Sequence, residues 1–198
     1  MTPDTKSLIF DTALRLFAAE GYDNVTMRQI AGAVGIKAGS MYHHFKSKEQ
    51  ILMACYHFYA EHRHDTRLPK EYYEPILRHG TKEAVLQVLN YAYHDDILDK
   101  MISCLLIMFS RMYIDEQAKA LYADEINASM NYLKEFFTTG IAIGRFHAFN
   151  HASISLLYLS FRLFVAQSTT LKPEHKATWR KAEVEMLDEL LRSIPFAY

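Results

Sequence analysis

The chain has 198 residues, half of them hydrophobic, and a formal net charge of -1. This composition excludes a disordered chain and allows a substantial core in one domain or two small ones, and the charge gives no polyanion-binding signature for the molecule as a whole. The charge is uneven, because residues 1–48 hold six Lys and Arg against four Asp and Glu. That excess mildly favours DNA as a partner of the N-terminal end.

Cysteine usage and the longest apolar run bear on the compartment. Cys55 and Cys104 each lie in an apolar helical pattern, so we expect buried, reduced thiols. The most apolar run, residues 101–109, is far shorter than the roughly 18 residues that span a bilayer, and the N-terminal segment lacks the apolar core of a signal peptide. We therefore expect a soluble, cytoplasmic protein without a membrane partner.

The first predicted helix ends at Gly21. One face of it is marked by four apolar residues at helical spacing, Ile9, Ala13, Leu16 and Phe17. Glycine can take the backbone conformation that ends a helix, and the neighbouring Tyr22 can fold back as the apolar half of a C-cap. This helix is expected to support the segment that follows.

The segment from Thr26 to Lys48 has the pattern of two short helices joined by a tight turn. Thr26 and Gln29 form a capping box that starts one helix, and Gly35 can take the positive φ that ends it. A second helix, residues 38–44, must follow at once. Its side chains expected to point away from the core are Ser40, Tyr42 and His43. On the turn alone, a helix-turn-helix and an ordinary helical hairpin are equally supported.

The remainder of the chain is also predicted to be helical. Ser47 and Gln50 begin a fourth helix that runs to about residue 65. Residues 68–80 contain two prolines and a glycine and are predicted to be a loop region with at most a short helical turn. Five further helices are predicted over residues 81–94, 97–112, 115–140, 151–168 and 174–193. The absence of alternating polar and apolar positions leaves an all-α fold of nine helices.

A set of residues in the N-terminal segment resembles the tetracycline-repressor (TetR) family. The set is Thr26, Ala31, Gly35, Gly39, Tyr42, His44, Phe45 and Lys48, in a module followed by a long helical remainder. The resemblance is specific over about residues 8–60 and architectural beyond them. It implies a three-helix, helix-turn-helix DNA-binding domain over residues 1–47 and a six-helix ligand-binding and dimerisation domain over residues 48–198.

The resemblance also implies how DNA is held. Phosphate contacts are expected from Thr26, Tyr42, His44 and Lys48, and base-edge contacts from Arg28, Ser40 and His43. Lys37 departs from the family pattern, which usually has serine or threonine at this helix cap. The cap should be weaker, and Lys37 could contact either a phosphate or a base.

A homodimer is expected because one recognition helix covers too few base pairs for specific binding, whereas a two-fold dimer reaches two successive major grooves of a near-palindromic operator. The last two predicted helices present more apolar surface than a monomer leaves exposed. The predicted interface residues are Ile154, Leu157, Tyr158, Phe161, Phe164, Trp179, Met186, Leu187 and Leu190.

The abundance of aromatic residues and methionine has two interpretations of equal weight. With 13 Tyr, 12 Phe and 9 Met, the C-terminal part could be a plain packed core or could contain an adaptable apolar cavity. The predicted cavity residues are Tyr59, His62, Phe109, Met130 and Phe137. A ligand among them would tilt the fourth helix and so change the spacing of the two recognition helices.

Other chemistry has little support in the sequence. His57, Glu61 and His64 share one helix face at a spacing that could bind a metal, but this face is opposite the apolar stripe and is better explained as a solvated surface. We find no phosphate-binding loop, zinc-type cysteine pair or nucleophile elbow, so neither an enzyme nor a cofactor is expected.

The function expected from these patterns is a DNA-binding transcriptional regulator, more specifically a repressor released by a small apolar or aromatic ligand. A first alternative is a helical regulator that responds to a protein partner or has no ligand. A second is an enzyme or carrier that retains a DNA-reading module.

Overall fold

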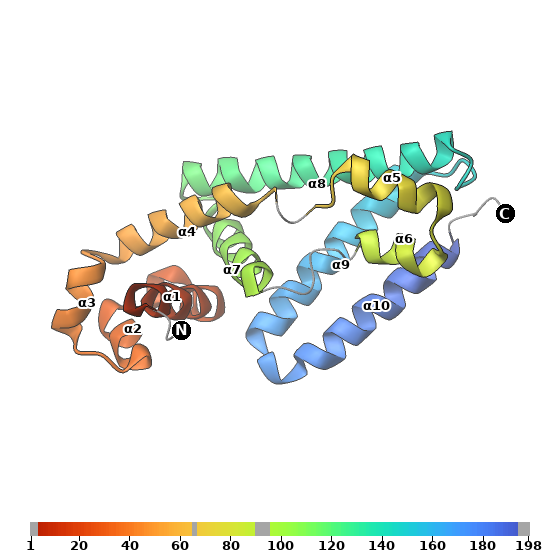
Figure 1. The fold of residues 1–198 in the computed structure, drawn as a ribbon. Helices are drawn as coiled ribbons and strands as arrows, with labels where there is room; N and C mark the ends of the chain where they lie inside the picture. Colours follow the sequence, from red (N-terminus) through yellow and green to blue (C-terminus); the bar gives the residue numbers. More distant parts are fainter. Residues whose placement is uncertain (1–3, 65–66, 90–95, 194–198) are drawn as a thin grey trace. The chain divides into compact units, whose positions relative to one another are not determined.

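The computed structural model describes residues 4–64, 67–89 and 96–193, and this part of the chain is helical without a strand, as predicted (Figure 1). The helices are α1 (Thr5–Glu20), α2 (Met27–Val34), α3 (Ala38–His44), α4 (Lys48–His62), α5 (Lys70–His79), α6 (Lys82–Leu89), α7 (Asp96–Arg111), α8 (Glu116–Ala142), α9 (His151–Leu171) and α10 (Lys176–Ser193). Short 3-10 turns, η1 (Tyr22–Asn24) and η3 (Pro173–His175), precede α2 and α10.

The chain divides into two compact units. Unit 1 consists of Met1–Arg63 and Asp96–Ala123, and unit 2 of His64–Asp95 and Asp124–Tyr198. Packing thus places α4, α7 and the start of α8 in the same unit as α1 to α3. The domain boundary predicted between residues 47 and 48 stays a prediction.

The core of unit 1 is built around α1, because buried residues of α2, α3, α4 and α7 all pack in one cluster with it. Its fully buried members include Ile9 of α1, Ile30 of α2, Met41 of α3, Ile51 of α4 and Ile107 of α7. Helix α1 ends as predicted at Gly21, which has a φ of +85°. Cys55 and Cys104 are free and lie in this core, as expected, and burial together with contact between the two thiols raises the pKa of Cys104.

The prediction of a loop over residues 68–80 is wrong, because α5 occupies most of it. Tyr73 and Leu77, four residues apart, are both buried in the core of unit 2. Burial of such a pair stabilises the helix by more than the hydrogen bond lost at Pro75 inside it. Pro69 precedes the first turn, where a proline does not interrupt helical hydrogen bonds.

The core of unit 2 is mainly aromatic. Phe136 and Phe137 of α8 pack with Phe146 and Phe149 of the segment that follows, at ring-centroid distances of 5.3 to 6.3 Å. The helix was predicted to end at about Gly140, but this glycine lies inside α8, which continues to Ala142. A Cβ at this position would lie 2.3 Å from the Phe146 ring. The glycine is therefore explained by close packing.

A further predicted helix end differs from the structure. Helix α9 extends to Leu171, three residues beyond the predicted end at Ser168. The end of the helix predicted over residues 81–94 lies outside the described residues, which stop at Leu89.

Candidate DNA interface

The turn between α2 and α3 has the geometry that the sequence predicts. The Gln29 backbone N–H donates to Thr26 Oγ1 at 3.3 Å, and the Thr26 N–H donates to Gln29 Oε1 at 2.8 Å, which completes the capping box. Gly35 ends α2 in the left-handed conformation, with φ +79° and ψ 25°. Residues without a glycine's freedom rarely adopt this conformation, so the turn depends on Gly35.

Two apolar residues, one in α3 and one directly after it, anchor this helix in the core of unit 1. Met41 is fully buried, and Phe45 directly after the helix is also buried. The predicted outward side chains are exposed, and Tyr42 exposes 46% of its surface although it is aromatic. The N-cap Lys37 makes no side-chain capping bond, in line with the expected weaker cap.

The other predicted DNA contacts flank α3. Thr26 and Arg28 are exposed at the start of α2, and His44 is partly buried at the end of α3. An exposed α3 held from behind by two apolar anchors can present its polar side chains to a groove. These roles stay predictions.

Lys48 makes contacts that the sequence did not indicate. It is the first residue of α4, whose N-cap Ser47 accepts a hydrogen bond from the Gln50 N–H at 3.1 Å. Its Nζ donates to the Tyr22 backbone oxygen at 2.8 Å and lies 4.1 Å from the Tyr22 ring centroid. No spacing rule links residues 26 positions apart, so only the folded chain reveals this contact.

The five predicted ligand-binding residues are divided between the two units. Tyr59 is buried in the core of unit 1, where His62 stacks on Phe58 with ring centroids 4.2 Å apart. Phe109 is also in unit 1, 5.4 Å from Tyr122 between ring centroids. Met130 and Phe137 belong to unit 2, where Phe137 is part of the aromatic core.

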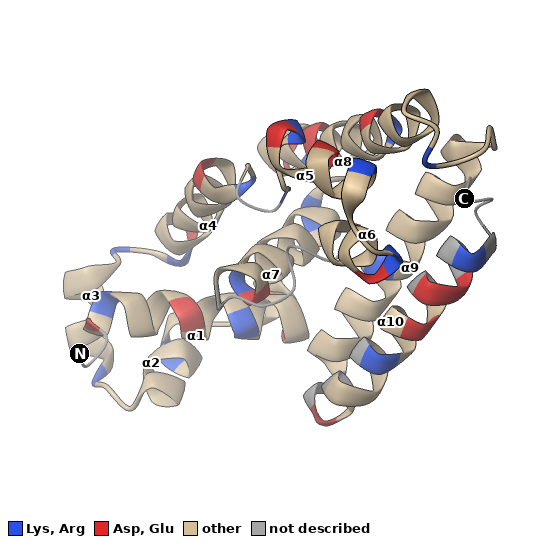
Figure 2. Ribbon diagram, turned by 45° about the vertical axis from the view of Figure 1, so that its right-hand side comes forward, with Lys and Arg blue, Asp and Glu red and all other residues tan. Residues whose placement is uncertain are grey.

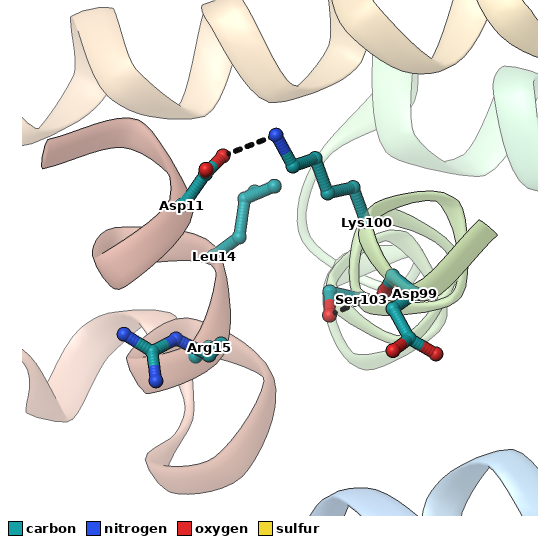
Figure 3. Close-up of a pocket in the computed structure, with 6 residues that line it drawn as sticks. All are labelled: Asp11, Leu14, Arg15, Asp99, Lys100 and Ser103. Carbon is teal, nitrogen blue, oxygen red and sulfur yellow. Dashed lines mark hydrogen bonds and ion pairs between the residues drawn. The ribbon is translucent and has the colours of Figure 1, made fainter. Parts of the chain in front are cut away.

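Neither of two pockets that are lined by described residues contains any of the five. One, of about 270 Å³, lies between α1 and α7 and is shown in Figure 3; its lining is Asp11, Leu14, Arg15, Asp99, Lys100 and Ser103. Lys100 Nζ lies 2.8 Å from Asp11 Oδ1, so an ion pair joins the two helices at this pocket. The other, of about 320 Å³, lies along α5 and includes Glu71, Pro75 and His79.

Unit 2 holds buried and partly buried polar groups that the sequence did not indicate. Burial raises the pKa of Tyr73 to about 12 and raises the pKa of Tyr132 further above its usual value. The Arg67 guanidinium contacts the Glu125 carboxylate and donates to Ser129 Oγ at 2.8 Å. A tyrosine in a helical apolar pattern gives no sign of whether its hydroxyl is buried, so the sequence could not single these residues out.

The predicted dimer residues are only partly on the surface. Leu157 and Phe164 of α9 expose 59% and 49% of their surface, and Ile154 and Phe161 are partly buried. Trp179 is partly buried, with its ring centroid 5.5 Å from that of Phe164, and Met186 packs against the core of unit 2. The side chains of Leu187 and Leu190 lie outside the described residues.

Tyr158 is a correction to that set. It is 3% exposed, and its hydroxyl donates to the Leu89 backbone oxygen at 2.6 Å within unit 2. Its position in the helical pattern faces the protomer's own core. In contrast, Leu156 of α9 and Val184 of α10 were not predicted but are well exposed.

The segment that most resembles a membrane span is α9, whereas the sequence analysis considered only residues 101–109. It is the one helix of the described chain that is long and apolar enough to cross a membrane, with a mean hydropathy of 1.2 in an 18-residue window. One such helix is weak evidence of a membrane span, because length and composition alone do not distinguish it from a core helix of a soluble protein. His57 and Glu61 of α4, considered above as metal ligands, are both exposed, with His57 Nε2 at 3.4 Å from Glu61 Oε1.

The comparisons with known proteins give their specific match in the N-terminal part of the chain. The profile of bacterial regulatory proteins of the tetR family matches residues 9–55. Over 59 residues the chain is 44% identical to the HTH-type transcriptional repressor KstR2 of Mycolicibacterium smegmatis, covering 26% of this chain and 29% of that protein. It is 42% identical over 57 residues to IcaR of Staphylococcus aureus (strain Newman), a negative transcriptional regulator of a biofilm operon, covering 27% and 31%.

A third relative is YerO of Bacillus subtilis, described as an uncharacterised HTH-type transcriptional regulator, with 41% identity over 56 residues, 28% of this chain and 19% of that protein. The chain thus matches less than a third of the length of each of these relatives. All three are named as regulators, in agreement with the prediction that the chain is not an enzyme.

Solved structures extend the likeness of fold to nearly the whole chain. PfmR, a TetR family transcriptional regulator from Thermus thermophilus, is 19% identical with a TM-score of 0.65, over 93% of this chain and 97% of that one. A protein from Saccharomonospora viridis, solved in complex with choline, is 18% identical with a TM-score of 0.66, over 96% of both chains. The match to the tetR family of bacterial regulatory proteins is thus specific over residues 9–55, and the solved structures show a likeness of fold over the rest of the chain.

Proposed function

We propose that this protein is a DNA-binding transcriptional regulator that acts as a homodimeric repressor on a near-palindromic operator. The observation that carries the proposal is the α2–α3 segment: a capped turn, a short helix anchored by Met41 and Phe45, and exposed polar side chains on its other face. This is the arrangement by which a recognition helix enters a major groove. A cytoplasmic location follows from that function.

Dimerisation is supported by the exposed apolar residues of α9. Figure 2 shows α9 almost without charged positions, whereas α10 carries both acidic and basic ones. Leu156, Leu157 and Phe164 are exposed large apolar side chains on α9. Apolar surface of this kind is typical of a protein interface, and a second copy of the chain would cover it and place two α3 helices on one operator.

Release by a small apolar or aromatic ligand is supported by the interior of unit 2. A cluster of aromatic rings there is accompanied by the buried phenol groups of Tyr73 and Tyr132. Ligand sites in proteins combine apolar walls with a few polar groups in this way. The similar protein from Saccharomonospora viridis was solved with choline, and two curated relatives are named as repressors or negative regulators.

A regulator that responds to a protein partner or has no ligand is the second candidate. It is favoured by the distribution of the predicted ligand residues over both units. A thermal-shift screen of the purified protein against mixed small molecules separates the two. A ligand that raises the Tm and also weakens DNA binding supports ligand-controlled repression.

Selection of binding sites from random double-stranded DNA tests the DNA-binding function. We expect an enriched near-palindrome whose half-sites are separated by about one helical turn, ~34 Å. The matched variant is Tyr42→Ala, which removes an exposed side chain of α3 and should reduce enrichment without lowering the Tm. Failure of the parent protein to enrich any sequence would overturn the proposal.

A further inference from the structure

Two cations share the ring of Tyr22 in unit 1. Lys48 Nζ lies 4.1 Å and Arg111 Cζ lies 4.3 Å from its centroid. The ring itself is held by the core, since it meets Phe17 of α1 edge-on with centroids 5.1 Å apart. A cation at this distance from an aromatic face is attracted by the ring quadrupole. Tyr22 therefore connects the first residue of α4 with the last residue of α7.

Arg111 holds the η1 turn through a second contact. Its Nη1 lies 3.4 Å from both carboxylate oxygens of Asp23. The Arg111 side chain is only 14% exposed although that of Asp23 is 74% exposed. A guanidinium partly shielded from water is less screened than a surface cation, and its planar fork suits a carboxylate.

Arg111 is in turn fixed by the start of α8. Its Nε lies 3.7 Å from Asp115 Oδ2, and the same oxygen accepts a hydrogen bond from the Tyr56 hydroxyl at 2.9 Å. Burial alone would raise the pKa of Asp115, but hydrogen bonds from the Ala118 N–H and the Tyr56 hydroxyl, with the Arg111 charge, hold this pKa below its usual value. The carboxylate therefore keeps its charge at neutral pH and orients Arg111.

The consequence reaches DNA through Lys48. Its ammonium has three N–H donors; one is directed to the Tyr22 backbone oxygen at 2.8 Å. A lysine side chain that is already held by a carbonyl and a ring has less rotamer entropy to lose when it meets a phosphate. The first turn of α4 would favour the same phosphate through its free N–H groups.

We propose that Arg111 is a positioning residue of the DNA interface: by holding Tyr22 and Asp23 in place, it keeps Lys48 where its ammonium meets a phosphate. Arg111 lies far outside residues 9–55, which match the family profile. The part of the protein that supports DNA binding would therefore include the end of α7. The inference rests on the proposed function, because it assigns a phosphate contact to Lys48.

The DNA test compares Arg111→Ala with Lys48→Ala on the selected operator and on unrelated DNA. Each variant should weaken binding to both DNAs by a similar factor and lower the salt slope by about one unit, the signature of one lost phosphate contact. In the double variant the affinity should equal that of Lys48→Ala alone. Additive losses, or an unchanged salt slope in Arg111→Ala, would overturn the inference.

Lys100→Ala is the matched control for the same helix. It removes a cation from α7 and breaks the 2.8 Å ion pair with Asp11 (Figure 3), while Arg111 and Tyr22 stay in place. Its salt slope should equal that of the parent. A slope lowered as much as in Arg111→Ala would mean that any loosening of α7 has the same result, and this outcome also overturns the inference.

A measurement without DNA separates the inference from the proposed function. The Lys48 ε-CH₂ protons should show an upfield NMR shift from the Tyr22 ring, which Tyr22→Phe keeps because the hydroxyl makes none of these contacts. Tyr22→Leu should abolish the shift, and Arg111→Ala should reduce it while Lys100→Ala leaves it intact. An unchanged shift in Arg111→Ala overturns the positioning role. If the parent binds no DNA, the proposed function fails, while this shift still decides the role of Arg111.

Discussion

In unit 1, the segment from α2 to α4 is fixed by hydrogen bonds between residues three positions apart, such as Thr26 with Gln29 and Ser47 with Gln50. In unit 2, the core joins aromatic residues of α5 and α8, such as Tyr73 and Phe136, which are far apart in the chain. The first kind of interaction leaves a pattern in the sequence, and the second leaves only composition. The tetR family profile accordingly matches residues 9–55 of unit 1, whereas the two solved structures described above, which match nearly the whole chain in fold, are 18% and 19% identical to it.

The largest expected effect tests whether the apolar surface of unit 2 forms the dimer that the DNA-binding helices of unit 1 need for operator binding. Leu157→Glu combined with Phe164→Glu places two charges on the exposed face of α9 and should give a monomer with severely reduced operator affinity, because two half-sites can no longer be bound together. Light scattering at micromolar concentration and operator titration measure the two results.

Tyr113→Glu is the control for that pair, because Tyr113 is 85% exposed but lies in unit 1 after α7. This variant should leave the molar mass measured by light scattering unchanged. A parent protein that is already a monomer at this concentration contradicts the prediction.

A glycine in each unit gives the next comparison. Gly140→Ala would place a Cβ 2.3 Å from the Phe146 ring and should destabilise unit 2 by about 1–3 kcal/mol through overpacking. Gly32→Ala in α2 meets open space, so the better helix propensity of alanine should stabilise unit 1 by up to about 1 kcal/mol. Urea unfolding of both variants measures the two signs. Destabilisation by both variants would contradict the contrast between them.

The capping box predicts a smaller effect, confined to unit 1. Thr26→Ala removes the acceptor for the Gln29 N–H and should cost about 1 kcal/mol of stability. Thr26→Ser keeps the hydroxyl oxygen and should stay close to the parent. Hydrogen exchange at the α2 amides localises the change, and equal protection in the alanine variant and the parent would rule out this role for the cap.

The smallest effect appears only at alkaline pH. Burial raises the pKa of Tyr73 from its usual 10 to about 12. The stability that comes from keeping the phenol neutral is fully present below pH 10 and is lost as the pH rises toward 12. Tyr73→Phe should therefore lose less stability than the parent between pH 10 and 12 and behave like it near neutrality, as followed by thermal unfolding across this range. Parallel curves would show that Tyr73 does not titrate with folding.

The sequence predicted those features that depend on neighbours along the chain. The capping box, the left-handed Gly35, the exposed Tyr42 and the buried Met41 all follow from spacing within one or two turns. Helix α5 was missed because Pro75 is a local signal, whereas the burial of Tyr73 that outweighs it depends on α8.

Side-chain partners distant in the sequence could not be predicted for the same reason. Tyr158 and Leu157 are adjacent in an apolar helix, and only the fold shows that the first donates a hydrogen bond inside unit 2 while the second is exposed. Arg111 at the end of a helix gave no sign that it would meet Tyr22. Periodicity assigns residues to a helix face, but it does not say what that face meets.

The inclusion of α7 in unit 1 limits how this protein can be dissected or recombined. Met101, Ile107 and Met108 of α7 are buried in the same cluster as α1, so a fragment that stops after residue 63 would expose the apolar face that they cover. A chimera that joins the DNA-binding helices of this protein to the C-terminal domain of a relative would need to carry residues 96–123 along with residues 1–63. The exchangeable piece of the molecule is therefore discontinuous in the gene, although the motif that identifies it is not.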